Sequence, residues 1–254
     1  MQDSIDQNFN RHACFIPALT DGMKVHHGKH LSWVDSDLSC DTFNIIHITD
    51  GQSGVEKELQ AAIQYFRQKQ FAHCVWVSES NLSDFVSHAF TELGLQSQGE
   101  ETGMKLDLGN LDMDFSPSAS IQVVRSREAL SQYAKVIAEN WSPPDQNVLA
   151  YYHKTAGHYL NPDHQINLLV YLEDGEAVCC AEMFPTDAET VGLYGFATLE
   201  AWRGKGIGSA LFQASLQKAK EHGYQQVVLQ ATEDGIGIYT RYGFVVGEKY
   251  FEFS

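Results

Sequence analysis

Residues 203–208 carry the clearest chemical pattern in the chain, because three glycines alternate with other residues over one short stretch. An apolar run, 191–198, precedes them and an amphipathic run, 209–221, follows them. A strand is therefore predicted to pass through a turn into a helix. Glycine removes side chains that would block close approach, and a helix N-terminus attracts negative charge. The pattern predicts a turn whose backbone N–H groups bind a pyrophosphate.

Two nucleotide-binding loops share this general chemistry, and the spacing argues against both. A P-loop needs GxxxxGK followed by Ser or Thr, and no such string occurs in the sequence. A dinucleotide loop needs GxGxxG directly after a strand. Gly204, Gly206 and Ser209 approach that spacing, and Glu233 stands where a ribose-binding acid is expected. However, four residues separate the strand from Arg203, and only 21 residues follow Glu233, too few for the remaining strands of a doubly wound sheet.

A third loop type, RxxGxG, is matched by Arg203, Gly206 and Gly208. Residues 239–244 read Tyr-Thr-Arg-Tyr-Gly-Phe, which is similar to a Y-x-x-x-G-F ending. With the preceding strand, these two motifs make residues 121–254 resemble the GCN5-related N-acetyltransferase (GNAT) superfamily. The resemblance implies an α/β (α+β) fold with a mixed, mostly antiparallel central sheet flanked by helices.

Residues 1–115 resemble a second, smaller and degenerate GNAT-like half. Strand, helix and strand recur over 43–108 at spacings similar to those over 190–253, although two α/β pieces can also look alike by chance. Residues 50–54, Asp-Gly-Gln-Ser-Gly, stand in place of the glycine loop. They lack the arginine and carry an acid, so the first half is expected to bind no pyrophosphate.

The elements that would position these motifs follow from hydrophobic periodicity and turn residues. A polar stretch at 109–120 predicts a domain boundary, with domains of 1–115 and 116–254. Residues 1–40 are weakly patterned. After them, strands are predicted at 43–48, 74–77, 104–108, 121–124, 166–172, 177–184, 190–198, 227–230 and 244–253. Helices are predicted at 55–69, from a cap at Asn81 to 93, from a cap at Ser126 to 140, from Pro144 past 152, at 209–221 and at 236–242.

The resemblance implies that acetyl-CoA is the cosubstrate and that the acetyl group passes to a primary amine by direct attack in a ternary complex. In the family the pantetheine arm lies beside the strand before the loop, and the pyrophosphate lies on the loop. An Asn that often contacts pantetheine is missing here, and Thr232 could substitute for it. The residues so implied to bind the cosubstrate are Phe196, Ala197, Thr198, Arg203, Gly204, Lys205, Gly206, Ile207, Gly208, Ser209 and Thr232.

Two catalytic residues are implied in the same way. The family's general base is often a carboxylate on the central sheet, which indicates Glu182, with Glu189 as the second choice. The family's general acid is often the Tyr of Y-x-x-x-G-F, here Tyr239, because a phenol with a pKa of about 10 has a proton to give to a leaving thiolate. The structural alternatives are an edge glutamate for Glu182 and a packing tyrosine for Tyr239.

The composition of the chain limits the kinds of partner that it is expected to bind. The chain has 33 acidic and 17 basic residues, giving a net charge of -16, which disfavours nucleic acid and anionic membranes. No apolar run is long enough to span a membrane, and five scattered cysteines without CxxC spacing indicate reduced thiols in a cytoplasmic protein. His26, His27 and His30 have no evident fourth ligand, so no metal is expected.

The acceptor is expected to be an amine on a small molecule or a peptide, and the chain to act as a monomer or homodimer. Acidic charge mildly favours a cationic acceptor. The alternative function from another class is a non-catalytic acyl-CoA-binding sensor or interaction protein. A nicotinamide-dependent enzyme is a more distant third.

Overall fold

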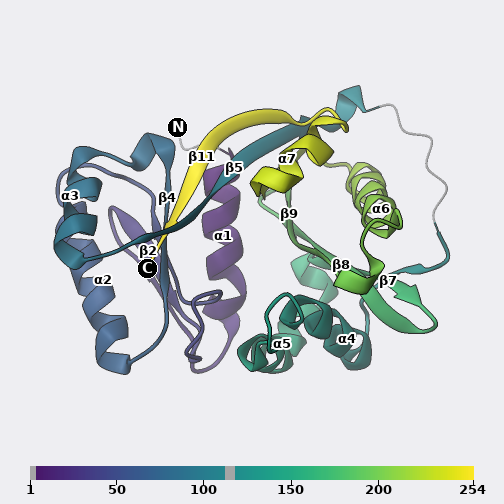
Figure 1. Ribbon diagram of the computed structural model, residues 1–254, viewed down its shortest axis with the longest axis horizontal. Coiled ribbons are helices and arrows are strands. Elements are labelled where there is room, and N and C mark those ends of the chain that lie inside the picture. Colours follow the sequence, from purple (N-terminus) through teal and green to yellow (C-terminus); the bar gives the residue numbers. More distant parts are fainter. Residues whose placement is uncertain (1–3, 112–117) are drawn as a thin grey trace. The chain divides into compact units, whose positions relative to one another are not determined.

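The computed structural model describes residues 4–111 and 118–254, so part of the predicted linker at 109–120 lies outside the described residues. The contacts divide the chain into two compact units. Unit 1 comprises residues up to 104 together with 230–254, and unit 2 comprises 105–229. Each unit is a mixed α/β structure built on a mostly antiparallel sheet (Figure 1).

Among its described residues, unit 1 has helices in its N-terminal part and one short helix, α7, before its last strand. Its helices are α1 (Ser4–Leu19), α2 (Val55–Lys69), α3 (Asp84–Leu93) and α7 (Glu233–Thr240). Its strands are β1 (Lys24–His27), β2 (Leu31–Asp35), β3 (Ile45–Ile48), β4 (Cys74–Ser78), β5 (Ser97–Asp107) and β11 (Val245–Phe253). They follow the order β1-β2-β3-β4-β11-β5. Only the β3–β4 pair is described as parallel in unit 1.

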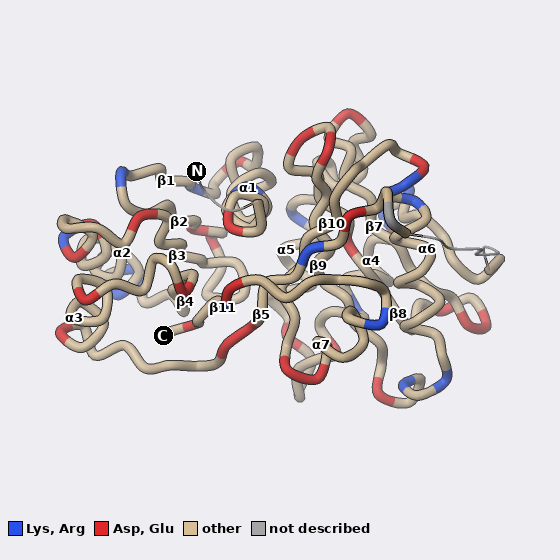
Figure 2. Tube along the Cα trace, turned by 90° about the horizontal axis from the view of Figure 1, so that it is seen from above, with Lys and Arg blue, Asp and Glu red and all other residues tan. Residues whose placement is uncertain are grey.

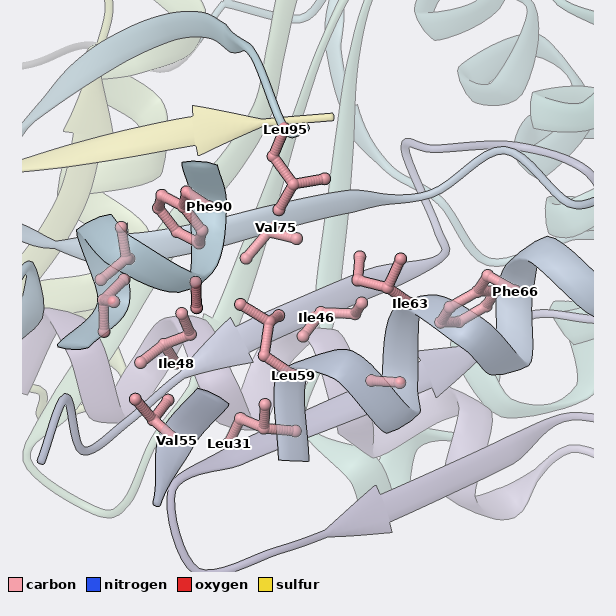
Figure 3. Packing of buried hydrophobic residues seen from close by; sticks show 14 residues of the cluster. Leu31, Ile46, Ile48, Val55, Leu59, Ile63, Phe66, Val75, Phe90 and Leu95 are labelled. Carbon is pink, nitrogen blue, oxygen red and sulfur yellow. The ribbon is translucent and has the colours of Figure 1, made fainter. Parts of the chain in front are cut away.

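The main core of unit 1 lies between its sheet and helices α2 and α3. The predicted helix 55–69 forms with those bounds, and its spaced apolar residues Leu59, Ile63 and Phe66 are fully buried. They pack against Ile46 and Val75 of the neighbouring parallel strands (Figure 3). Helix α3 is capped by the hydroxyl of Ser83, not by Asn81 as predicted, and ends at Gly94. The cap moves because the Ser83 oxygen accepts from the N–H of Val86, as an N-cap side chain should.

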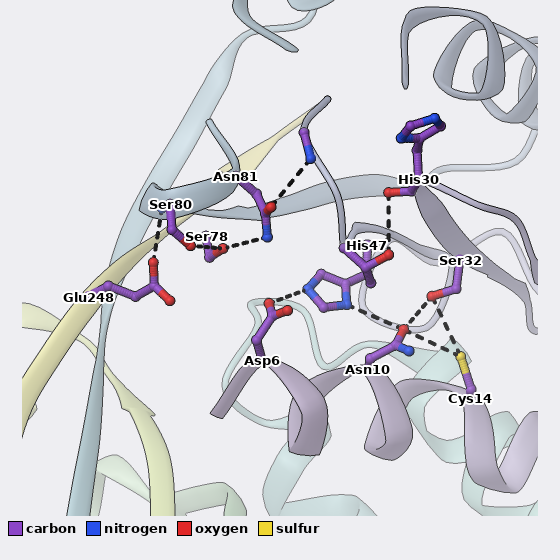
Figure 4. Close-up of polar contacts among 12 residues, drawn as sticks. Asp6, Asn10, Cys14, His30, Ser32, His47, Ser78, Ser80, Asn81 and Glu248 are labelled. Atoms are coloured by element: carbon purple, nitrogen blue, oxygen red, sulfur yellow. Dashed lines mark hydrogen bonds and ion pairs between the residues drawn. The ribbon is translucent and has the colours of Figure 1, made fainter. Parts of the chain in front are cut away.

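Helix α1 covers the other face of this sheet (Figure 1). No helix was predicted there, because residues 1–40 are weakly patterned. Helix α1 holds to the sheet partly through polar groups. The Nε2 atom of His47 on β3 lies 2.8 Å from Oδ1 of Asp6, and both side chains are at most 2% exposed. The other ring nitrogen lies 3.3 Å from Oδ1 of Asn10, which also accepts from Ser32 (Figure 4). A helix that buries Asp and Asn lacks a clean apolar stripe, so periodicity misses it.

The C-terminal strand completes the sheet of unit 1. Strand β11 lies between β4 and β5, and Phe251 pairs antiparallel with Val77. The N–H of Ser80 donates to Glu248 at 2.9 Å, a contact drawn in Figure 4. The contact division therefore differs from the predicted domains of 1–115 and 116–254. Strand pairing across a long sequence separation, which leaves no local pattern, places β11 in the first unit.

Unit 2 follows the sequence prediction closely. Its helices are α4 (Arg127–Ala138), α5 (Gln146–Tyr159) and α6 (Ile207–Glu221), and its strands are β6 (Ile121–Val123), β7 (Asn167–Glu173), β8 (Glu176–Pro185), β9 (Thr190–Thr198) and β10 (Gln226–Ala231). They follow the order β10-β9-β8-β7-β6, with β9–β10 parallel. Ser126 caps α4 as predicted, whereas Asp145 caps α5 after the two prolines.

Adjacent residues of β9 approach α4 and α6. A Cβ on Gly195 would lie 2.7 Å from the hydroxyl of Tyr133 on α4, whereas the ring of Phe196 packs edge-on against Phe212 on α6. Both helices therefore pack against β9 at neighbouring residues. Acidic positions exceed basic ones along both units (Figure 2).

Candidate active site

The glycine loop forms the open start of α6. Gly206 is the N-cap residue, with φ of 80°, and Gly204 has φ of 73°. Both are left-handed conformations that glycine adopts at little cost. A Cβ on either would meet nothing within 4 Å, so the backbone faces open space. The first turn of a helix has N–H groups without intrahelical partners. Residues Ile207, Gly208 and Ser209 therefore present such groups where the helix dipole favours an anion.

The side chain of Arg203 holds this loop to the strand before it. Its Nε donates to the carbonyl oxygen of Thr198 at 2.9 Å. The short turn between them, Glu200–Trp202, is thus bridged by the arginine. The Lys205 ammonium lies 4.2 Å from the ring centre of Trp202, as a cation over an aromatic face. The Arg203 side chain therefore supports the loop.

Gly208 lets the helix start approach the end of β9 closely. A Cβ there would lie 3.3 Å from Oγ1 of Thr198 and 3.7 Å from the ring of Phe196. The Thr198 hydroxyl lies 3.1 Å from the thiol of Cys179 on β8. Three sequence-predicted binding positions, Phe196, Thr198 and Gly208, are therefore brought together.

Strand β9 carries a bulge just before these residues. Cys180 pairs with Ala197 and Glu182 pairs with Tyr194, so β9 has one residue more than β8 between these pairs. Gly195 has φ of 54°, and its carbonyl oxygen accepts from the Cys180 thiol at 3.3 Å. This bulge was not predicted, although a lone glycine inside a strand pattern is its usual signal.

Beyond Gly192, β9 runs without pairing to β10. The parallel pairing covers Thr190–Gln226 to Gly192–Val228, whereas β9 continues to Thr198. An extended ligand can form hydrogen bonds along such a strand edge. The open stretch of β9, which includes Ala197, leads directly to the glycine loop, so an extended arm that ends in a pyrophosphate fits this arrangement.

Glu182 on β8 lies inside a cluster of tyrosines. It is 2% exposed. Four tyrosines of α4 and α5 have a raised pKa, mainly because they are buried. The negative charge of Glu182 is a further cause for each of them, namely Tyr133, Tyr151, Tyr152 and Tyr159. These phenols therefore keep their protons at neutral pH. The sequence placed Glu182 on the correct strand but did not reveal its enclosure, because the four tyrosines come from two other elements.

The second choice for the base, Glu189, lies in the turn that joins β8 to β9. It is exposed and lies nine positions before Thr198. At about 3.3 Å per residue, that is roughly 30 Å along the strand from the loop. Glu182, in contrast, is the cross-strand partner of Tyr194, next to the bulge.

Thr232 and Tyr239 lie in the segment of the chain that belongs to unit 1. Thr232 is the exposed N-cap residue of α7, and its side chain makes no capping bond. Tyr239 packs against Phe244, with ring centres 5.9 Å apart. Burial first, and then the Glu101 charge, raises the pKa of Tyr239, so this phenol is protonated at neutral pH.

The corresponding helix start in unit 1, that of α2, is occupied by the chain's own side chains. The Gly54 N–H donates to a carboxylate oxygen of Glu56 at 2.9 Å. A Cβ on Gly54 would lie 3.0 Å from the ring of His30, which pairs with Asp50 at 3.1 Å. A carboxylate of the chain itself therefore occupies this helix start.

Other features of the described residues add no further chemistry to this site. All five cysteines are buried free thiols. Over residues 4–111 and 118–254, no group of three or more His, Cys, Asp or Glu is arranged to hold a metal ion. Within the same ranges no helix is both long and apolar enough to cross a membrane.

The comparison with protein families decides the identity of this region. Residues 128–244, which hold the bulged strand, the glycine loop and Tyr239, match the model of the Acetyltransferase (GNAT) family. These residues form a GNAT domain. The family uses acetyl-CoA as cosubstrate, and the open strand edge and helix start of this GNAT domain fit that molecule. No curated protein matches the chain.

Solved structures share the fold of the whole chain, beyond the GNAT domain. A GCN5-related N-acetyltransferase from Kribbella flavida has a TM-score of 0.70 at 16% identity, covering 98% of this chain and 95% of that one. A functionally unknown conserved protein from Staphylococcus epidermidis has a TM-score of 0.65 at 18% identity, covering 92% and 94%. A tandem GNAT protein from the clavulanic acid biosynthesis pathway has a TM-score of 0.59 at 12% identity, covering 92% and 83%. At these identities the likeness concerns the fold.

Proposed function

We propose that this protein transfers an acetyl group from acetyl-CoA to a primary amine by direct attack in a ternary complex. One observation carries the proposal. The open helix start at Gly206 is joined by Arg203 and Gly208 to the end of β9, whose edge is unpaired beyond Gly192. This combination suits an extended arm that ends in a pyrophosphate.

In this proposal, different segments of the chain bind different parts of the cosubstrate. The N–H groups of residues 204–209 bind the pyrophosphate, and the backbone of residues 196–198 pairs with the pantetheine arm. When bound, acetyl-CoA supplies the activated thioester. An arm that runs back along β9 from the loop reaches the bulge at Gly195, where Tyr194 faces Glu182 across the strands.

Glu182 is the proposed base for the acceptor amine, which must lose a proton to attack. Because the carboxylate is 2% exposed among tyrosines, we propose that it takes the proton through a tyrosine hydroxyl or a water rather than by direct contact. Tyr239 is the proposed acid for the leaving thiolate. Its assignment rests on its position in the Tyr239–Phe244 motif and on a phenol that burial keeps protonated.

The test has two readouts on the purified full chain. Acetyl-CoA should raise the melting temperature, because a ligand that binds only the folded state stabilises it. A panel of primary amines should then release coenzyme A thiol in the presence of acetyl-CoA. No melting shift at millimolar acetyl-CoA would refute the proposal. A shift without thiol release from any amine would favour the acyl-CoA-binding sensor instead.

A further inference from the structure

A cavity lies in unit 2 at the end of α6 that is remote from the glycine loop. Its volume is about 280 Å³, well above the roughly 30 Å³ that one water occupies in the liquid. His222 lines it, directly after the last residue of α6. Since α6 has 15 residues and rises about 1.5 Å per residue, some 22 Å of helix separates this cavity from the loop. It is therefore a separate site from the proposed pyrophosphate site.

Among the described residues that line this cavity, Arg125 carries a permanent positive charge. Arg125 and His222 are among its lining residues, and no Asp or Glu is, although acidic residues outnumber basic ones in the chain by 33 to 17. One Nη of Arg125 lies 3.4 Å from Oδ1 of Asn167, which orients the guanidinium while leaving most of its donors for a ligand. Nδ1 of His222 lies 2.7 Å from the carbonyl oxygen of Lys218, which holds the ring at the cavity wall.

Two lining polar side chains are more than nine-tenths buried, which gives the cavity a built polar wall. Asn167 is 6% exposed and Tyr224 is 8% exposed. Burial, and then the charge of Asp187, raises the pKa of Tyr224, so its hydroxyl keeps a proton to donate. The Asp187 carboxylate does not line the cavity, and one of its oxygens accepts two backbone N–H groups, from Glu189 and Thr190, at 2.8 Å each.

The rest of the wall combines the amide side chain of Gln165 with apolar and aromatic side chains. Ile166, Ala188 and Pro162 line it, and the rings of His222 and Tyr224 are nearly parallel, with 11° between their planes and 6.4 Å between centres. A bare inorganic anion would leave these surfaces unfilled. A flat, mostly apolar body with one carboxylate would use both the rings and the guanidinium.

We propose that this cavity is a binding site for a small aromatic or compact aliphatic carboxylate, held by the Arg125 guanidinium and the Tyr224 hydroxyl. The site lies within one unit and does not depend on the transferase proposal. Its ligand is neither the acyl donor nor the amine acceptor of that proposal.

Benzoate is the probe, with benzamide as its uncharged counterpart of nearly the same shape. In calorimetric titrations of the full chain, benzoate should bind and benzamide should bind at least about tenfold more weakly, because the charged hydrogen bond is lost. Inorganic phosphate should bind more weakly than benzoate. Three results would each overturn the proposal: equal affinity for benzoate and benzamide, phosphate affinity higher than benzoate affinity, or no detectable benzoate binding at about 20 mM.

The variant Arg125→Gln should lower benzoate affinity about tenfold or more. Arg127→Gln is the matched control. Arg127 lies two residues after Arg125 and does not line the cavity, so this variant removes the same charge outside the proposed site. Tyr224→Phe keeps the ring and should weaken benzoate binding by a smaller factor. Equal losses in Arg125→Gln and Arg127→Gln would show general charge attraction only and would contradict a built site.

Discussion

The Nε atom of Arg203 lies 2.9 Å from the carbonyl oxygen of Thr198, so the residue that opens the glycine loop also fixes the end of the preceding strand. This bond joins the two parts of the proposed cosubstrate site, the strand edge and the helix start. The basic residue of the loop pattern therefore acts on the loop's own geometry, and in the proposed site the backbone N–H groups bind the anion.

Two substitutions of Arg203 distinguish the contribution of its positive charge from that of its hydrogen bond to the strand. Arg203→Lys keeps a positive charge but has no guanidine Nε to reach Thr198. We expect the Kd for acetyl-CoA to rise roughly tenfold in Arg203→Lys and as much in Arg203→Gln, which is the cost of one charged hydrogen bond. Calorimetry measures this. Wild-type affinity in Arg203→Lys with weak binding in Arg203→Gln would mean that the charge, and not the bond, is what counts.

A carboxylate placed at the start of α6 should expel the pyrophosphate without harming the helix. Ser209→Glu puts a negative charge in the first turn, where the helix dipole favours it, but beside the proposed anion. The Kd for acetyl-CoA should rise at least about tenfold, with the melting temperature of the free protein unchanged or raised. Gln213→Glu, one turn further on, is the control and should bind nearly as wild type. Equal effects of the two variants would argue against a pyrophosphate at this helix start.

The proposed acid is tested by removing one oxygen atom. Tyr239→Phe should lower kcat about 100-fold, within the usual range for general acid catalysis, and leave the Kd for acetyl-CoA unchanged. Steady-state rates from thiol release, with calorimetry for binding, provide the comparison. Tyr242→Phe, on the following turn, is the control and should keep most of the activity. Unchanged turnover in Tyr239→Phe would remove the tyrosine from the chemistry.

The bulge at Gly195 should depend on the lack of a side chain there. Gly195→Ala forces a residue with a Cβ into φ of 54°, with that atom 2.7 Å from the Tyr133 hydroxyl. We expect a loss of about 2–3 kcal/mol in the free energy of unfolding from denaturant titration. Tyr133→Phe removes the colliding oxygen, so the same glycine substitution should cost less in that background. Gly157→Ala, inside α5 with open space around it, should be neutral or stabilising. Equal costs in both backgrounds would rule out the contact with Tyr133.

Glu101 on β5 should make stability depend on pH in the neutral range. Burial, and then the charge of Glu252, raises its pKa from 4.5 to about 7. Between those values the folded state holds a proton that the unfolded state has lost, so stability falls as pH rises from about 4.5 to about 7 and levels off above that. Glu101→Gln should flatten this slope and raise stability at pH 8 by on the order of 2 kcal/mol.

The control for this pH series is Glu100→Gln, which changes the neighbouring exposed carboxylate that pairs with Lys249. It should leave the slope between pH 5 and pH 7 in place. Denaturant titrations at a series of pH values measure both variants. A slope in Glu101→Gln as steep as in the wild type would assign the pH dependence to other groups.

Much of unit 2 could be predicted because its signals are local. The strand at 190–198 has its predicted bounds, Ser126 caps its helix, and the glycines at 204 and 206 adopt the left-handed conformations that a loop before a helix needs. In unit 1, the helix at 55–69 was predicted with its observed bounds, whereas α1 was missed because polar side chains hold it to the sheet. A cap, a turn or an apolar stripe is set by residues within a few positions of one another.

The sequence by itself determined the order strand, glycine loop, helix and closing Tyr239–Phe244 motif, and with it the family of residues 128–244. Only the tertiary structure decided that β11 pairs with β4, that four tyrosines from α4 and α5 surround Glu182, and that Arg203 binds Thr198. These outcomes rest on contacts between elements that are distant in sequence or on the geometry of a turn. Their physical basis is the burial of side chains and backbone groups by partners that no local pattern identifies.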